Sequence, residues 1–234
     1  MGLDKLEIKL RKLTNPSKAA DLQRFFKTGK GEYGKGDVFL GIAVGKQRRL
    51  AQEFKEINLS EVQELLDSRI HEKRLIGLLI LIERFKRAPE DSKKEIFDFY
   101  IKNSHRVNNW DLVDLSAPNI VGNYLLDKPR DILYELAVSD NLWQRRISII
   151  SCFSFIKNKE FPDALEISRK LLNDKHDLIH KAVGWMLREI GKRDEKILMN
   201  FLEKNYSRMP RTALRYSIER FEEDKRKRCL IGKF

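Results

Sequence analysis

The sequence predicts an all-α protein, built as an α-solenoid of stacked helical repeats. Apolar residues recur at i, i+3, i+4 and i+7 in almost every segment, which is the spacing of amphipathic helices. No segment shows sustained alternation of polar and apolar residues between hairpin turns, as strands would. Similar helix-opening residues recur about every 35 residues, and a period of that length with two helices per unit is typical of a solenoid.

The expected helices follow one another closely from residue 59 onward. Ser60 is expected to be the N-cap of a short helix, and residues 72–85 to form a strongly apolar one. Further helices are expected over residues 92–101, 110–126, 129–137, 141–156, 161–172, 179–191, 196–204 and 210–227. We therefore expect a single domain over residues 1–234. Its residues 1–58 hold less regular helices and a Gly- and Lys-rich loop, and residues 59–234 hold regular two-helix repeats with a basic C-terminal end.

The register of the repeats places cations at equivalent positions. Arg74, Trp110, Arg146 and Lys181 are separated by 36, 36 and 35 residues, and Arg215 follows after a further 34. The second helix of each repeat usually lines the concave face of a solenoid, so equivalent residues form a ladder along that face. Because four of the five positions are cationic, the ladder predicts a groove that follows phosphates.

The overall charge also favours a polyanionic partner. The 47 Lys and Arg residues exceed the 35 Asp and Glu residues, for a net charge of +12, and residues 204–234 carry +6 of it. Clusters of this kind bind nucleic acid through counterion release, although a solvated basic face would show the same composition. The loop of residues 29–37 lacks the Gly-Lys-Ser/Thr triplet of an ATP-binding loop. We expect it to contact backbone phosphates instead, through Lys30 and Lys35.

Several other classes of protein are excluded. Two cysteines, Cys152 and Cys229, cannot form a disulfide framework, so we expect a reducing cytoplasm. The longest apolar run is far shorter than the roughly 20 residues that cross a membrane. Charged residues lie near Met1 where a secretory signal would be apolar, so we expect no such signal. His176 and His180 lack the third ligand of a zinc site. We therefore expect no metal, no cofactor and no membrane partner.

Each of the three tryptophans lies three or four residues from a charged side chain and therefore shares a helix face with it. These groups are Trp110 with Asp114, Trp143 with Arg146, and Trp185 with Lys181 and Arg188. A single group of this kind usually belongs to a hydrophobic core, but three in successive repeats indicate a functional surface. A carboxylate between aromatic faces is suited to stabilising a positive charge.

Three segments, taken in this order, resemble the AlkD-type DNA alkylation-repair glycosylases. They are residues 109–114 (Asn-Trp-Asp-Leu-Val-Asp), 140–146 and 181–189, and residues 25–42 are similar as well. The resemblance covers essentially the whole chain. It implies a C-shaped stack of HEAT-like repeats that holds double-stranded DNA in a basic concave groove. It also implies excision of positively charged N3- and N7-alkylated purines, as in base-excision repair. For a solenoid that encircles its ligand we expect a monomer.

By position, the resemblance makes Asp114 the catalytic carboxylate and Arg146 the active-site arginine. Trp110 and Trp185 match the aromatics that pack around the deoxyribose of the lesion. The cations expected to bind the DNA backbone are Lys181, Arg188, Arg145, Arg74, Arg215, Lys30 and Lys35. The sequence departs from the family pattern at Asn109, where some members have a second tryptophan, and at Phe25 or Phe26, where some have a tyrosine. These departures bear on the substrate range.

The proposed chemistry suits these residues. An alkylated N3 or N7 already carries a positive charge, so the base leaves without a general acid, and the enzyme needs only to stabilise the oxocarbenium-like sugar and admit a water. No lysine is placed as a Schiff-base nucleophile, so we expect a monofunctional enzyme. Two alternatives remain open: a non-catalytic HEAT-repeat protein that binds damaged or branched DNA, and a protein-interaction scaffold, which the basic ladder disfavours.

Overall fold

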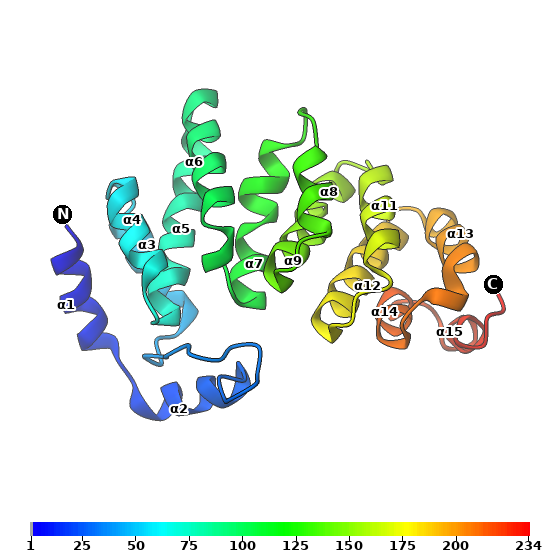
Figure 1. The fold of residues 1–234 in the computed structure, drawn as a ribbon, viewed down its shortest axis with the longest axis horizontal. Helices are drawn as coiled ribbons and strands as arrows, with labels where there is room; N and C mark the ends of the chain where they lie inside the picture. Colours follow the sequence, from blue (N-terminus) through cyan, green and yellow to red (C-terminus); the bar gives the residue numbers. More distant parts are fainter. Residues whose placement is uncertain (1) are drawn as a thin grey trace. The chain divides into compact units, whose positions relative to one another are not determined.

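The chain is a succession of α-helices in the computed structural model, which describes residues 2–234 (Figure 1). The all-α prediction is confirmed, because the described residues contain no strand and their one β-type pairing is an isolated bridge between Val38 and Ile70. None of the described helices is both long and apolar enough to cross a membrane. The chain divides into two units, the first ending at Leu112 and the second beginning at Val113. The expectation of a single domain stays a prediction, and each unit is described by itself.

The first unit is organised around α5 (His71–Arg87). Because this helix is apolar on almost every side, it is buried from residue 74 to residue 82 and contacts α3, α4 and α6. In Figure 1 these helices lie side by side in cyan and green. The other elements of this unit are α1 (Leu3–Leu13), α2 (Pro16–Phe25), α3 (Val44–Glu53), α4 (Leu59–Asp67), α6 (Glu90–Lys102), the 3₁₀ turn η1 (Ser104–Arg106) and the start of α7 (Trp110–Ser116).

The second unit is organised around α12 (Asp177–Gly191), which packs most extensively against α14. A Cβ atom at Gly184 would lie 2.5 Å from the carbonyl oxygen of Ala213, so glycine is required for this close approach. The other elements are the π-turn η2 (Pro118–Gly122), α8 (Asp131–Ala137), α9 (Leu142–Ser151), α10 (Phe153–Lys157), α11 (Pro162–Leu171), α13 (Glu195–Asn205), the 3₁₀ turn η3 (Tyr206–Arg208), α14 (Arg211–Ser217) and α15 (Glu223–Leu230).

Three of the long helices expected from the sequence are each two shorter elements. Residues 110–126 form α7 and the π-turn, because Pro118 has no N–H for the α-helical hydrogen bond. Residues 141–156 divide between α9 and α10, where the side chains of Ser151 and Cys152 donate to backbone carbonyls four residues earlier. Residues 210–227 divide between α14 and α15. Apolar periodicity continues through these breaks and therefore does not reveal them.

Two helix starts also differ from the sequence expectation. The N-cap of α4 is Asn58 rather than Ser60, and it forms a capping box with Glu61. The N-cap of α12 is His176, whose Nδ1 accepts a hydrogen bond from the Leu178 N–H. Both expected helices therefore begin two residues earlier than the sequence predicted.

Candidate active site and nucleic-acid interface

Trp110 lies at the edge of an aromatic cluster in the first unit. The ring of Phe26 stacks on Trp110, with the centroids 5.3 Å apart, and on Phe39, at 5.1 Å. Phe25 meets Trp110 edge-on at 6.0 Å and is 63% exposed. The exposed ring of Phe25, at the end of α2, thus continues the aromatic surface formed by the half-buried ring of Trp110, at the start of α7. The sequence placed Phe25 and Phe26 in a segment similar to the family and noted one of them as a departure from its pattern, whereas the structure packs both rings against Trp110.

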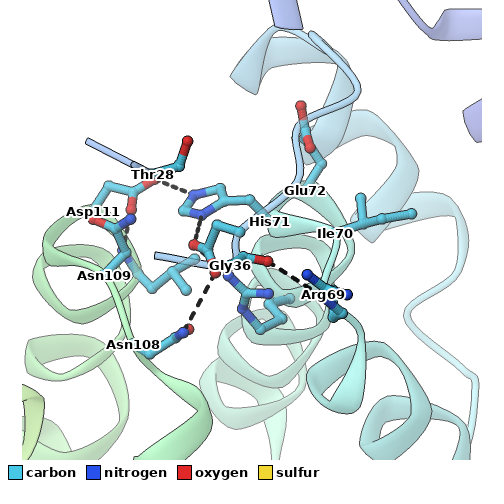
Figure 2. Close-up of polar contacts among 12 residues, drawn as sticks. Thr28, Gly36, Arg69, Ile70, His71, Glu72, Asn108, Asn109 and Asp111 are labelled. Carbon is cyan, nitrogen blue, oxygen red and sulfur yellow. Dashed lines mark hydrogen bonds and ion pairs between the residues drawn. The ribbon is translucent and has the colours of Figure 1, made fainter. Parts of the chain in front are cut away.

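His71, at the start of α5, is buried between two carboxylates. Its Nδ1 lies 3.3 Å from Oδ2 of Asp37 and its Nε2 lies 2.8 Å from Oδ2 of Asp111. Figure 2 shows the imidazole of His71 beside Asp111, which is half-buried at the start of α7. Asp37 also pairs with Arg74, whose Nη2 lies 2.7 Å from the same carboxylate. Four charged side chains therefore form one network in the first unit.

This network favours a protonated histidine. Burial lowers the pKa of His71, but the hydrogen bonds to Asp111 and Asp37 outweigh it and raise the pKa above the ordinary value of 6.5. Burial raises the pKa of Asp37, but the hydrogen bond to His71 and the charge of Arg74 outweigh it and lower that pKa. An imidazolium donates from both ring nitrogens, so the protonated form satisfies both carboxylates at once.

Sequence reasoning missed the role of His71. Its partners lie 34 and 40 residues away, and no local spacing connects them. The only sequence signal was a histidine at the start of a strongly apolar helix, which by itself does not identify a partner.

Asp114 and Arg146 form the corresponding feature of the second unit. The guanidinium of Arg146 donates from Nε to Oδ1 and from Nη2 to Oδ2 of Asp114, both at 2.8 Å. A third donor, Nη1, binds the carbonyl of Leu178 at the start of α12. The Arg146 side chain is 5% exposed and the Asp114 side chain 19% exposed. A buried, bidentate guanidinium therefore fixes the plane of a carboxylate that still reaches the surface.

The remaining two tryptophans have different environments. Trp185, on α12, is half-buried, and its ring centroid lies 6.0 Å from that of Phe153. Trp143 is buried in α9 and belongs to the core, so the expectation that all three tryptophans lie on or beside one functional surface is not met. The reason is that Trp143 lies on the face of α9 that packs against neighbouring helices. The residue spacing within one helix does not show which of its faces is buried.

Most of the predicted DNA-binding cations of the second unit are paired with carboxylates. Lys181 lies 2.8 Å from Asp177, and Arg188 pairs with Glu219. Arg145 donates to Asp174 at 2.6 Å and to the carbonyls of residues 139 and 140. Arg215 is exposed.

In the first unit, Lys30 and Lys35 are exposed, whereas Arg74 is only 3% exposed. The predicted ladder of exposed cations is thus corrected at Arg74, because this guanidinium is buried with Asp37 and donates to the carbonyl of Ser68. Burying it beside a carboxylate and a carbonyl stabilises the charge that the apolar surroundings of α5 would otherwise exclude.

The described residues hold no group of three or more His, Cys, Asp or Glu side chains placed to bind a metal ion. Cys152 is buried, and burial raises the pKa of its thiol, so it is a core residue rather than a nucleophile.

The sequence model of the family described as DNA alkylation repair enzymes matches residues 6–221 of the chain. Among solved structures, a predicted DNA alkylation repair enzyme from Enterococcus faecalis is 16% identical, with a TM-score of 0.72 over 90% of this chain and 97% of that one. AlkD2 from Streptococcus mutans is 17% identical, with a TM-score of 0.55 over 88% and 97%. No curated protein matches the sequence.

At these identities the two structures show the shared all-α repeat fold. The family match covers most of the chain, and it implies an enzyme whose partner is DNA. The chain belongs to the family of DNA alkylation repair enzymes.

Proposed function

We propose that the protein is a monofunctional DNA glycosylase that removes cationic N3- and N7-alkylated purines from double-stranded DNA, as the first step of base-excision repair. Family membership supports the repair of alkylated DNA. The observation that carries the finer proposal is the carboxylate of Asp114, which Arg146 holds in a fixed plane while part of it remains exposed.

In this proposal, the N-glycosidic bond breaks with its electron pair moving to the alkylated base. The base was cationic and leaves neutral, so no proton has to be supplied to it. The deoxyribose becomes an oxocarbenium ion, which the negative charge of Asp114 stabilises. A water then adds to C1′ and loses a proton to the solvent, and the products are the free base and an abasic site. Removing one such electrostatic contact costs about 10²–10³-fold in rate.

The neighbouring side chains have distinct roles in this proposal. Arg146 is a positioning residue, because its bidentate hydrogen bonds aim the carboxylate. Trp110 precedes Asp114 by four residues in α7 and, together with Trp185, packs against the deoxyribose and excludes water. The exposed cations Arg215, Lys30 and Lys35 bind backbone phosphates.

The test is the release of free bases from methylated duplex DNA, detected by mass spectrometry. We expect wild type to release 3-methyladenine or 7-methylguanine and Asp114→Asn to release neither above background. Asp177→Asn is the matched control, because Asp177 is also an aspartate paired with a cation in the second unit, Lys181. Turnover of Asp114→Asn close to wild type would show that this carboxylate is not the catalytic one.

The second candidate is a non-catalytic protein that binds damaged or branched DNA. It is favoured by the full pairing of Asp114, since both of its oxygens accept from Arg146, as in a purely structural ion pair. In that case no base is released from any alkylated duplex, and the affinity for DNA is the same in wild type and in Asp114→Asn. In either case we propose a monomer in the cytoplasm, which size-exclusion chromatography and cell fractionation would test.

A further inference from the structure

A polar pocket of about 280 Å³ lies in the first unit, next to the buried carboxylate of Asp37. Three segments line it: the Gly- and Lys-rich loop, the turn between α4 and α5, and the segment around η1. Figure 2 shows Gly36, Arg69 and Asn108, one from each of these segments. Nothing in the proposed catalytic chemistry uses this pocket.

The charges of the pocket do not balance. Its lining holds the four cations Lys35, Arg69, Arg74 and Arg106 and the two carboxylates Asp37 and Asp67. Asp37 is shared by Arg74 and His71, and Asp67 lies 3.0 Å from Arg106. The carboxylates are thus committed, and the surplus positive charge is that of Lys35 and Arg69. Both of these side chains are exposed, and Arg69 makes only a long hydrogen bond of 3.4 Å to the carbonyl of Gly36.

Arg74 provides a second, independent observation. It lines the pocket and is 3% exposed, yet its Nε–H donor has no hydrogen-bond partner. A buried donor on a charged group is costly when it is left without an acceptor. An anion in the pocket would lie beside this buried guanidinium and would offset the surplus charge.

We propose that this pocket binds one phosphate group. A phosphate offers several acceptor oxygens to donors from different directions, and guanidinium groups suit it in particular. Its source is either the DNA backbone or a free phosphate-bearing molecule. The DNA source, which rests on the proposed function, is favoured because the pocket is connected to the proposed catalytic residues. Asp37 bonds Arg74 in the pocket and also His71. The ring of His71 packs against Phe26, which in turn stacks on Trp110.

The test uses a variant in which both exposed cations are neutralised, Lys35→Gln with Arg69→Gln, in the full chain. Neither side chain is part of the buried network, so the fold is preserved. The matched control is Arg11→Gln with Lys12→Gln, which also removes one exposed Arg and one exposed Lys from the first unit. In the first arm, inorganic phosphate is titrated into ¹⁵N-labelled protein, against the same ionic strength of chloride. In the second arm, duplex DNA affinity is measured at several salt concentrations.

We expect phosphate to shift the amide signals of Gly36, Arg69 and Asn108 in wild type and in the control, and not in the pocket variant. We also expect the slope of log affinity for DNA against log salt to fall by about 1 in the pocket variant, with a smaller change in the control. A phosphate response with an unchanged DNA slope would assign the site to a free phosphate-bearing molecule. No phosphate response and no change of slope would overturn the proposal. Neither arm measures base release, so a protein without glycosylase activity would give the same readings.

Discussion

The helix α7 carries two aspartates, and each is held by a different buried cation. Asp111 accepts from His71 and Asp114 accepts from Arg146. Both carboxylates are about one-fifth exposed, and both cations are almost fully buried. The difference lies in the chemistry of the cation, because a histidine loses its charge near neutral pH whereas an arginine keeps it.

The two carboxylates on α7 therefore differ in the electrostatic role they can take. The carboxylate of Asp114 accepts two hydrogen bonds from a guanidinium, which fixes its plane as an electrostatic site requires. The network around His71 is satisfied only while the imidazole is protonated, since only then does it donate to both Asp37 and Asp111. The first is suited to catalysis, and the second joins Asp37 and Asp111 through a side chain that can titrate.

The largest expected effect separates the two aspartates by activity. Asp114→Asn should reduce the release of alkylated bases by about 10²–10³-fold, because the developing positive charge loses its counter-charge. Asp111→Asn should reduce it much less, since its carboxylate serves the His71 network. Single-turnover release from methylated duplex DNA measures both. Equal losses in the two variants would show that the two carboxylates contribute equally to base release.

The next effect is on stability. His71→Leu should lower the free energy of unfolding by about 3 kcal/mol, because it leaves the buried carboxylate of Asp37 and the carboxylate of Asp111 without their shared cation. Urea unfolding followed by circular dichroism gives this value. His105→Leu is the control: this histidine is exposed, and its replacement should change stability by no more than about 0.5 kcal/mol. A similar result for both variants would mean that the network contributes little.

The comparison is sharpened by pH. Because the pKa of His71 is raised in the folded protein, its contribution to stability is complete below about pH 6.5 and is lost as pH rises through the raised pKa. We expect stability to fall with pH in that window by at most about 1.4 kcal/mol per unit. His71→Gln should remove this slope. Burial lowers the pKa of His176, so its effect lies below pH 6.5 and has the opposite sign. A slope that persists in His71→Gln would assign it to other groups.

The smallest expected effect concerns DNA affinity in the second unit. Arg215→Gln should reduce the slope of log affinity against log salt by about 1, because this cation is exposed. Lys181→Gln should reduce it by less, because Asp177 already lies 2.8 Å from the ammonium group. Fluorescence anisotropy with an undamaged duplex at four or more salt concentrations resolves the two. A larger effect for Lys181→Gln would show that this ion pair opens on DNA.

The sequence by itself determined the fold class, because apolar periodicity and the repeat near 35 residues are local patterns that need no knowledge of neighbours. The resemblance to the alkylation-repair glycosylases also singled out Asp114 and Arg146, and the structure pairs these two residues, which are 32 positions apart in the chain. The helix breaks at Pro118 and Ser151 were missed because apolar periodicity runs through them.

Only the tertiary structure decided which charges are buried and with whom. His71 has partners 34 and 40 residues away, and Arg74 belongs to a buried pair rather than to an exposed ladder. Trp143 is a core residue although its spacing from Arg146 matches that of the other tryptophans from their charged neighbours. The physical reason is that the free energy of a charge or an aromatic ring depends on its desolvation and its partners, and both are set by segments distant in the chain.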